Sequence, residues 1–156
     1  MHISSQLVQI GSKTDPRTGA LSTPIYQTAS FRHPALGEST GYDYTRSGNP
    51  TRQALEEGLA RLEGGADACA FSSGLAAITT LLLLYKQGDH LIVVEDCYGG
   101  TYRLFEQVLS RFGLTASYVD ATTLDAIGQA LRPETKAVFI ETPTNPLLRI
   151  VDVRAL

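Results

Sequence analysis

Small polar residues stand where a helix is expected to begin, in the run Ser72-Ser73-Gly74-Leu75. Free backbone N–H groups and the positive end of the helix dipole meet at such a start, so an anion of phosphate size can bind there. Small side chains leave the anion room to approach the backbone. The same run is also compatible with an ordinary strand-to-helix turn that binds nothing.

A second group lies upstream, in Tyr44-Thr45-Arg46-Ser47-Gly48-Asn49-Pro50. Tyr44 and Arg46 are two residues apart, so in an extended segment their side chains point the same way. A guanidinium offers bidentate hydrogen bonds to a phosphate, and a tyrosine hydroxyl adds another donor. The alternative is a pair of polar surface side chains before a capped helix.

Two further groups follow expected buried strands. Tyr98 precedes Gly99-Gly100, and the loop Glu141-Thr142-Pro143-Thr144-Asn145-Pro146 follows the last strand, where either X-Pro bond is a candidate for the cis form. Open α/β sheets bind ligands at the carboxyl ends of their strands. There, Tyr98 can stack on a flat ring and Asn145 can donate to a ring oxygen, although Tyr98 could equally be a core tyrosine beside a helix. Together the four groups suit an aromatic ring that carries a phosphate.

The elements that must position these groups alternate between strands and helices. We expect helices over 50–63 and 75–85, from the turn Tyr98-Gly99-Gly100 to Phe112, and after Thr122 or Thr123, and strands over 68–71, 91–95, 115–119 and 137–140. This order with short connections predicts an α/β domain on a mostly parallel sheet with right-handed crossovers. The helix over 75–85 is apolar nearly all round, which predicts that it is covered on most sides. Asp152 is a candidate N-cap for a further helix that begins at residue 153.

The first 45 residues are polar, broken by Gly and Pro, and show no sustained period of 3.6 or 2. We therefore divide the chain into an extended arm, residues 1–45, and an incomplete α/β domain, residues 46–156. An arm with few apolar anchors needs another surface to lie on. That surface is either a neighbouring subunit or the arm's own domain.

Composition excludes several classes of function. The chain has 13 Lys and Arg against 16 Asp and Glu, a net charge of -3, so it lacks the positive charge with which proteins bind the phosphates of nucleic acid. Its most apolar stretch, 74–85, is too short to cross a membrane, no leader is apparent, and two cysteines favour a reducing cytoplasm. Metal-ligand spacings such as CxxC and HExxH are absent, so we expect no metal site. We expect surface histidines and core cysteines: His2, His33 and His90, and Cys69 and Cys97.

At these residues the sequence resembles the Cys/Met-metabolism family of pyridoxal 5′-phosphate (PLP) enzymes. This trans-sulfuration group includes cystathionine γ-synthase, cystathionine β- and γ-lyases, methionine γ-lyase and O-acetylhomoserine sulfhydrylases. The motifs run in register through essentially the whole chain, from Thr23-Pro24-Ile25-Tyr26 through Tyr98-Gly99-Gly100-Thr101-Tyr102-Arg103 to the Asn-Pro loop. The resemblance implies the N-terminal part of a fold-type I, aspartate-aminotransferase-like PLP-dependent transferase domain.

The resemblance also implies how the phosphate of PLP is bound. Gly74 and Leu75 would give it their backbone N–H groups, with Ser73 beside them. Tyr44 and Arg46 would reach the phosphate of the neighbouring subunit's PLP. This implies a homo-oligomer, a dimer of dimers, with shared active sites.

Three residues would surround the ring of PLP. Tyr98 would stack on the pyridine ring and act in catalysis, by assisting proton transfer or the departure of the leaving group. Asn145 would hydrogen-bond the ring O3′, and Glu141 would be a nearby polar wall.

One part of the family pattern is absent. In the family a Schiff-base lysine in a Ser-x-Thr-Lys segment, an Asp for the pyridinium nitrogen and an Arg for the substrate carboxylate lie C-terminal to the Asn-Pro loop. The 156 residues contain none of these, and the only lysines are Lys13, Lys86 and Lys136. We expect either the N-terminal portion of a longer active enzyme or a catalytically inactive fragment. A plain phosphate- or nucleotide-binding α/β module is a further alternative.

The subtype resembles the bacterial cystathionine γ-synthase and O-acetylhomoserine thiol-lyase branch. Gly-Glu-Ser-Thr-Gly at 37–41 precedes Tyr-Asp-Tyr-Thr-Arg, and Gly100 stands where methionine γ-lyases tend to carry Cys. The implied reaction is γ-replacement on an O-acyl-homoserine by cysteine or sulfide, with cystathionine β-/γ-lyase or methionine γ-lyase activity as the alternative. Leu75 replaces the commoner Met, with little consequence expected because that residue acts through its backbone.

Overall fold

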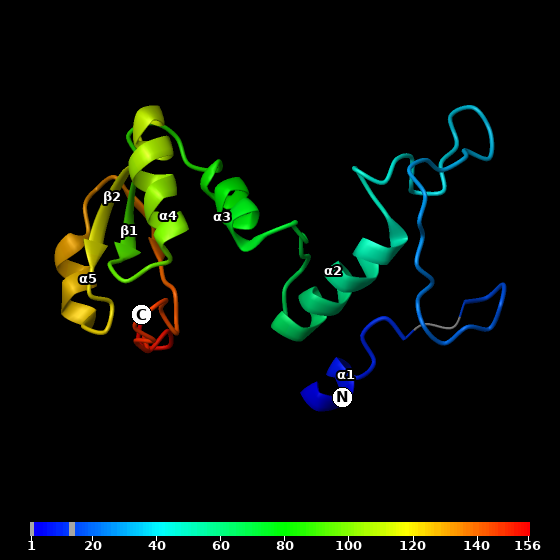
Figure 1. Cartoon of the computed structure of the whole chain (residues 1–156), viewed down its shortest axis with the longest axis horizontal. Helices are drawn as coiled ribbons and strands as arrows, with labels where there is room; N and C mark the ends of the chain where they lie inside the picture. The colour runs from blue at the N-terminus through cyan, green and yellow to red at the C-terminus, as the bar shows by residue number, and fades with distance from the viewer. Residues whose placement is uncertain (1, 13–14) are drawn as a thin grey trace. The chain divides into compact units, whose positions relative to one another are not determined.

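The structure is a computed structural model that describes residues 2–12 and 15–156, so Lys13 lies outside the described residues. The chain divides into two compact units, one up to Ala70 and one that runs from Phe71 to Leu156. The first unit contains helices α1 and α2, and the second contains the sheet with its helices (Figure 1).

Helix α2 (Pro50–Glu63) is the main element of the first unit and begins and ends where the sequence predicts. Pro50 occupies its first turn, and Asn49 Oδ1 accepts the Thr51 N–H at 2.8 Å, which caps the helix. Gly64 ends it with a φ of 66°, in the left-handed region that glycine adopts without strain. Local capping chemistry therefore defines this helix.

The residues before α2 contain one short helix, α1 (Ile3–Leu7), which the sequence did not indicate. Isolated antiparallel bridges pair Ser12 with Ser22 and Ser30 with Tyr44. Ile10 packs closely on α2, since a Cβ added at Gly58 would stand 2.7 Å from Ile10 Cγ2. That approach explains a glycine in the middle of a helix.

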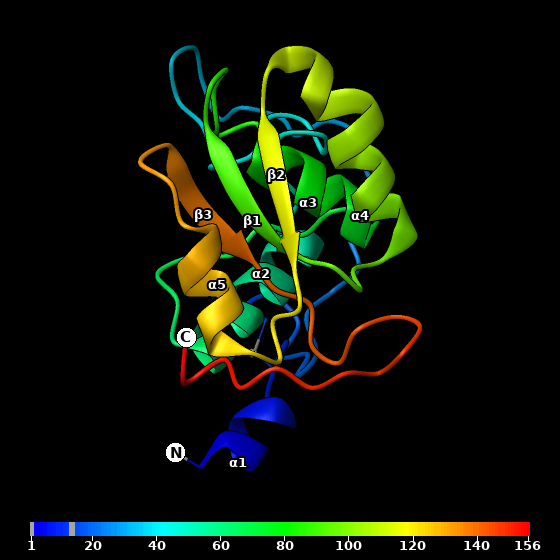
Figure 2. The same cartoon turned by 90° about the vertical axis from the view of Figure 1, so that its left-hand side faces the viewer.

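Three parallel strands form the sheet of the second unit, in the order β2-β1-β3 (Figure 2). They are β1 (His90–Val94), β2 (Thr115–Val119) and β3 (Thr135–Phe139). The central strand β1 is buried along its whole length, as its continuous apolar run predicts. The expected α/β architecture is thus confirmed, with helices in the crossovers between parallel strands.

Helices α3 (Gly74–Leu82) and α5 (Leu124–Ala130) are regular, whereas the helical stretch after Tyr98 changes its winding. That stretch consists of α4 (Gly99–Arg103), one π-helical turn (Leu104–Val108) and one 3₁₀ turn (Leu109–Phe112). The sequence predicted a single apolar face over it. The changed winding rotates the later positions, so Phe112 is 67% exposed although Leu109 is buried.

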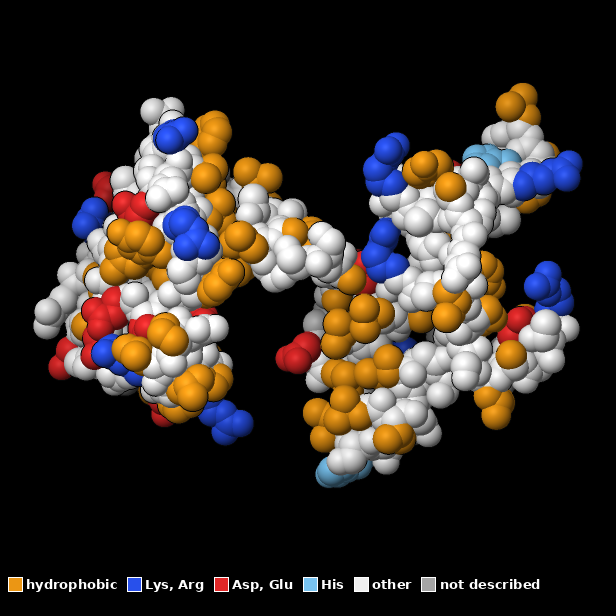
Figure 3. Space-filling view, in the orientation of Figure 1, with side chains coloured by type: hydrophobic (Ala, Val, Ile, Leu, Met, Phe, Trp, Pro, Cys, Tyr) orange, Lys and Arg blue, Asp and Glu red, His pale blue; other side chains and the backbone are white. Residues whose placement is uncertain are grey.

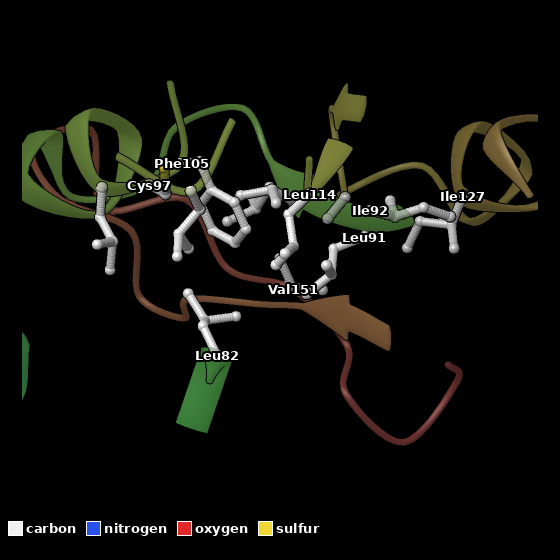
Figure 4. Packing of buried hydrophobic residues seen from close by; sticks show 13 residues of the cluster. Leu82, Leu91, Ile92, Cys97, Phe105, Leu114, Ile127 and Val151 are labelled. Atoms are coloured by element: carbon white, nitrogen blue, oxygen red, sulfur yellow. The ribbon is translucent and has the colours of Figure 1, made fainter. Parts of the chain in front are cut away.

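The hydrophobic core lies in the second unit, between the sheet and its helices. Figure 4 shows Leu82 of α3 pointing toward the cluster that contains Phe105 and Val151. The labelled members of the cluster are Leu82, Leu91, Ile92, Cys97, Phe105, Leu114, Ile127 and Val151. Residues from the helices, the central strand and the chain after β3 therefore share one core.

The expectation that α3 is covered on most sides is wrong. Only Leu82 of this helix is buried, and Leu81, Leu83 and Leu84 in and after its last turn are 51%, 70% and 78% exposed. Within the second unit the helix packs on one side only, because its remaining apolar side chains meet no covering surface there. Figure 3 shows hydrophobic side chains at the surface of each unit.

Two further elements are absent where they were expected. Residues 68–71 form no strand, and the Ala70 N–H donates to Glu56 Oε1 at 2.8 Å instead of to a neighbouring strand. Residues after Asp152 form a turn rather than a helix, although Asp152 Oδ1 accepts the Arg154 N–H at 3.0 Å. No helix in the described ranges is long and apolar enough to span a membrane.

Two expectations about single residues are also wrong. Cys69 is exposed, because the strand that would have buried it does not form, whereas Cys97 is buried as expected. His90 is 1% exposed rather than a surface residue, because it begins the central strand. Its Nδ1 lies 2.8 Å from Thr135 Oγ1 and its Nε2 lies 3.0 Å from Ser117 Oγ, so both neighbouring strands bind its ring.

Candidate functional site

The start of α3 has the geometry of an anion site. Ser73 is the N-cap, and its Oγ accepts the Ala76 N–H at 3.1 Å. In the described part of the chain the N–H groups of Gly74 and Leu75 have no partner, as expected for the first turn of a helix. A Cβ added at Gly74 would meet nothing within 4 Å, so the space before these donors is open. The donors and the open space fit a phosphate group.

Tyr98 and Glu141, which follow different strands, are brought together at the carboxyl edge of the sheet. The Tyr98 N–H donates to Glu141 Oε2 at 2.8 Å. The Tyr98 side chain is 47% exposed and lies over Gly100, where an added Cβ would overlap the ring. Gly100 thus leaves the space that the ring occupies, and Glu141 fixes the backbone that carries it.

Cys97, which precedes Tyr98, is chemically quiet. Burial raises the pKa of its thiol above the usual value, and the negative charge of Glu141 raises it further. A protonated, buried thiol is a poor nucleophile. The interpretation of Cys97 as a small core residue is therefore confirmed.

The loop that carries Asn145 is built around its neighbour Thr144, whose side chain is fully buried. Thr144 Oγ1 donates to Asp96 Oδ2 at 2.5 Å and accepts the Arg149 N–H at 2.9 Å. The Thr144 N–H donates in turn to the Arg149 carbonyl at 3.0 Å. Asn145 is thus an exposed residue next to a rigid anchor, and the peptide bonds before both prolines of the loop are cis.

Arg149 ties the same loop to the ends of two strands. Its Nη1 bonds Glu95 Oε1, just after β1, at 2.8 Å, and lies 3.8 Å from Asp120 Oδ2, just after β2. The hydrogen bond to Glu95 raises the pKa of Arg149 above its usual value, so the guanidinium stays charged. The sequence did not indicate Arg149, Thr144 and Asp96 as anchors. The only local signal was the position of Thr144 between two prolines.

Tyr44 and Arg46 belong to the first unit, and the other six predicted site residues belong to the second. The Arg46 guanidinium lies 5.0 Å from the centroid of the Tyr44 ring, and both side chains are exposed. The two side chains therefore lie together, as their spacing predicts. A guanidinium that packs on an aromatic ring keeps its edge donors available for an anion.

The described lysines lie away from the carboxyl edge. Lys86 precedes β1 and Lys136 is the second residue of β3, so both are near the amino ends of parallel strands. Both are exposed. Neither is placed to reach the edge where Tyr98 and the Asn145 loop meet.

Comparison with known proteins identifies the family. The model of the family described as Cys/Met metabolism PLP-dependent enzyme matches residues 4–156. The chain belongs to this family. The match confirms the resemblance seen in the motifs and makes PLP the cofactor to which the site must be compared.

Several relatives in this family carry different enzyme names. The chain is 52% identical over 152 residues to the cystathionine gamma-synthase/O-acetylhomoserine (thiol)-lyase of Bacillus subtilis. The aligned region covers 97% of this chain and 41% of that protein. It is 48% identical to the cystathionine beta-lyase of Lactococcus lactis subsp. cremoris, over 99% of this chain and 40% of that protein. The chain thus spans about two fifths of the length of these relatives. Their names assign different reactions, a gamma-synthase and thiol-lyase in one case and a beta-lyase in the other.

Solved structures of the family superpose closely on the chain. Cystathionine gamma-lyase from Lactobacillus plantarum, complexed with L-serine, matches with a TM-score of 0.91 and 48% identity, over 99% of this chain and 40% of its own. Cystathionine gamma synthase from Xanthomonas oryzae pv. oryzae, in complex with aminoacrylate and cysteine, matches with a TM-score of 0.92 and 41% identity, over 99% and 40%. The α/β piece described here is therefore the N-terminal part of the fold of a PLP-dependent enzyme.

Proposed function

We propose that the full-length protein that carries this chain is a PLP-dependent cystathionine γ-synthase. In this reaction the sulfur of cysteine or sulfide bonds to Cγ of an O-acyl-homoserine, and the acyloxy group leaves as a carboxylate. The observation that carries the proposal lies at the carboxyl edge of the sheet. There the Tyr98 N–H donates to Glu141, beside the Asn145 loop that Thr144 anchors to Asp96. The 52% identity to the Bacillus subtilis cystathionine gamma-synthase/O-acetylhomoserine (thiol)-lyase supports this reaction, while relatives named as beta- or gamma-lyases are 47–49% identical. The glycine at position 100 supports it too.

The residues of this chain would bind the phosphate of PLP. The N–H groups of Gly74 and Leu75, with Ser73 beside them, donate to it at the start of α3. Tyr44 and Arg46 add a hydroxyl and a guanidinium from a neighbouring subunit. For this the arm of residues 1–45 lies on that subunit, in a homo-oligomer with shared active sites.

Other residues of the chain would hold the ring and move protons. When bound, PLP supplies an electron sink that stabilises negative charge on substrate carbon atoms. Tyr98 stacks on the ring, and its hydroxyl holds or releases a proton at the substrate. Asn145 donates its side-chain N–H to a ring oxygen. Glu141 acts on Tyr98 through the backbone, because its carboxylate accepts the Tyr98 N–H.

Two assays on the full-length protein test the reaction. We expect consumption of O-acetylhomoserine in the presence of cysteine to be much faster than consumption of cystathionine alone. If only cystathionine is consumed, the protein is a lyase and the proposal is wrong. The Tyr98→Phe variant keeps the ring but removes the hydroxyl, so it should bind PLP normally and lose activity about 100-fold or more.

A second candidate concerns the 156-residue polypeptide by itself, which we propose to be catalytically inactive. The observation that favours it is the position of Lys86 and Lys136 near the amino ends of the strands. After incubation with PLP, the 156-residue polypeptide should consume neither O-acetylhomoserine with cysteine nor cystathionine. Measurable turnover of either substrate would overturn this second proposal.

A further inference from the structure

The turn that carries Tyr44 and Arg46 is held from behind by Arg52, in the first turn of α2. Arg52 Nη1 donates to the Thr45 carbonyl at 3.3 Å, and Nη2 donates to the Ser47 carbonyl at 3.0 Å. These two carbonyls belong to the residues on either side of Arg46. The planar fork of a guanidinium can bond both at once, which an ammonium cannot do with the same geometry.

Arg52 is itself fixed in position. Its Nε lies 3.3 Å from Glu56 Oε1, one turn later on α2, and the same Glu56 oxygen accepts the Ala70 N–H at 2.8 Å. The side chains of Arg52 and Glu56 are only 34% and 20% exposed. Asn49 fixes the start of the helix on which both stand. The support behind the turn is therefore continuous from α2 to the turn itself.

The turn also has a defined inner side. The Thr45 side chain faces inward, since its Oγ1 donates to the Thr28 carbonyl and accepts a bond from Asn49 Nδ2 at 3.1 Å. The flanking side chains of Tyr44 and Arg46 are left on the outer side, where the guanidinium lies over the ring. In the described part of the chain Arg46 forms no ion pair, so its charge is available to an anion.

We propose that Arg52 is a positioning residue for phosphate binding: it holds the turn so that Arg46 meets the cofactor phosphate in one fixed orientation. This inference rests on the proposed function, in which Arg46 binds the phosphate of PLP. Arg52 does not touch the anion, because three of its N–H groups are directed at two carbonyls and at Glu56. The two arginines therefore differ in role although both stand in one motif.

The test compares PLP with pyridoxal, which lacks the phosphate, on the full-length protein. Dissociation constants are measured by equilibrium dialysis for the wild type and for Arg52→Lys. The substitution keeps the charge but loses the fork, so we expect PLP to bind about 10-fold more weakly, the effect of about one lost hydrogen bond, and pyridoxal to bind unchanged. Equal weakening of both compounds would show a general structural role and overturn the inference.

Arg61→Lys is the matched control, since Arg61 stands on the same helix and its Nε donates to the Glu57 carbonyl at 3.1 Å, away from the turn. We expect it to bind PLP as the wild type does, and a PLP-selective loss equal to that of Arg52→Lys would overturn the inference. If Arg52→Lys is insoluble, Arg52→Gln replaces it. We expect Arg52→Gln to weaken PLP but not pyridoxal, and equal weakening of both compounds would again overturn the inference.

Arg46→Ala separates this inference from the function on which it rests. If Arg46→Ala leaves PLP affinity unchanged, the proposed contact between Arg46 and the phosphate is wrong. If Arg46→Ala weakens PLP but Arg52→Lys does not, only the role of Arg52 is wrong. We expect both to weaken PLP binding, and Arg52→Lys to cause a smaller loss in the Arg46→Ala background than in the wild type, because the turn then presents only the Tyr44 hydroxyl.

Discussion

The buried hydroxyl of Thr144 should hold the loop that carries Asn145, and Thr144→Val removes it at nearly constant shape. The substitution breaks the bond to the Asp96 carboxylate and leaves the Arg149 N–H without its acceptor. A hydrogen bond to a charged group contributes about 1.5–3 kcal/mol, and an unsatisfied buried donor costs about 1–3 kcal/mol. Because Thr144 is fully buried, water cannot replace the lost bonds. We expect the loop to lose about 2–4 kcal/mol of local stability.

Hydrogen exchange of the amides of Thr144 and Arg149 in the full-length protein measures this loss directly. Each 1.4 kcal/mol of local stability corresponds to tenfold in the exchange rate, so Thr144→Val should exchange roughly 30- to 1,000-fold faster at these amides. Peptides from the central strand β1 should exchange at the wild-type rate. The disturbed loop should also lower kcat, because Asn145 is no longer held in one place.

Thr144→Ser is the control, because it keeps the hydroxyl and loses only a buried methyl group. That loss is worth about 0.8 kcal/mol, or roughly 4-fold in exchange. If Thr144→Val exchanges like the wild type, the hydroxyl does not anchor the loop. If Thr144→Ser exchanges as fast as Thr144→Val, packing of the methyl group and not the hydrogen bond holds the loop.

Three further predictions concern the second unit, each on the full-length protein. Gly100→Ala should displace the half-exposed Tyr98 ring, so kcat should fall about 10-fold or more. The thermal midpoint should stay near that of the wild type, and an unchanged kcat would contradict the prediction. Burial lowers the pKa of His90 below 6.5, and the positive charge of Arg132 lowers it further. Protonation of His90 therefore favours the unfolded state. The stabilisation from neutral His90 is complete above about pH 6.5 and is lost as the pH falls below that value. Lowering the pH from about 7.5 to about 5.5 should therefore lower the urea midpoint of the wild type more than that of His90→Gln. Thr101 is fully buried and its Oγ1 has no partner among the described residues, so Thr101→Val should raise the free energy of unfolding by about 1 kcal/mol, and a lower value would show that the hydroxyl is bonded.

Local chemistry made the ends of the helices predictable. Asn49 and Ser73 accept N–H groups of the turns that follow them, and Gly64 and Gly113 adopt the positive φ that ends a helix. These interactions involve residues within a few positions, so the residue types reveal them. The central strand β1 was also predictable from the sequence, because a continuous apolar run predicts a strand that is buried on both faces.

Features that depend on distant partners were not predictable. The apolar pattern of α3 indicated a covered helix, but burial requires a surface that the pattern itself does not supply. Residues 68–71 have the composition of a strand, yet Ala70 bonds a side chain of α2. The sequence predicts a surface position for His90 and is wrong there, because the burial of this side chain depends on Ser117 and Thr135, from two other strands.

The candidate site divides in the same way. The residue types of Tyr98 and Asn145 indicated a ring-binding edge, because parallel strands end together. The bond that anchors that edge joins Thr144 to Asp96, 48 residues apart in the chain. Spacing along the sequence gives no sign of such a pair, so anchoring residues emerge only from the structure.

A crystal structure of the full-length protein with PLP would test the central claim most directly. The account predicts that the phosphate lies about 2.7–3.2 Å from the backbone nitrogens of Gly74 and Leu75, with Tyr98 against the ring and Arg46 of a neighbouring subunit at the phosphate. A phosphate bound elsewhere, with the start of α3 exposed to solvent, would contradict it.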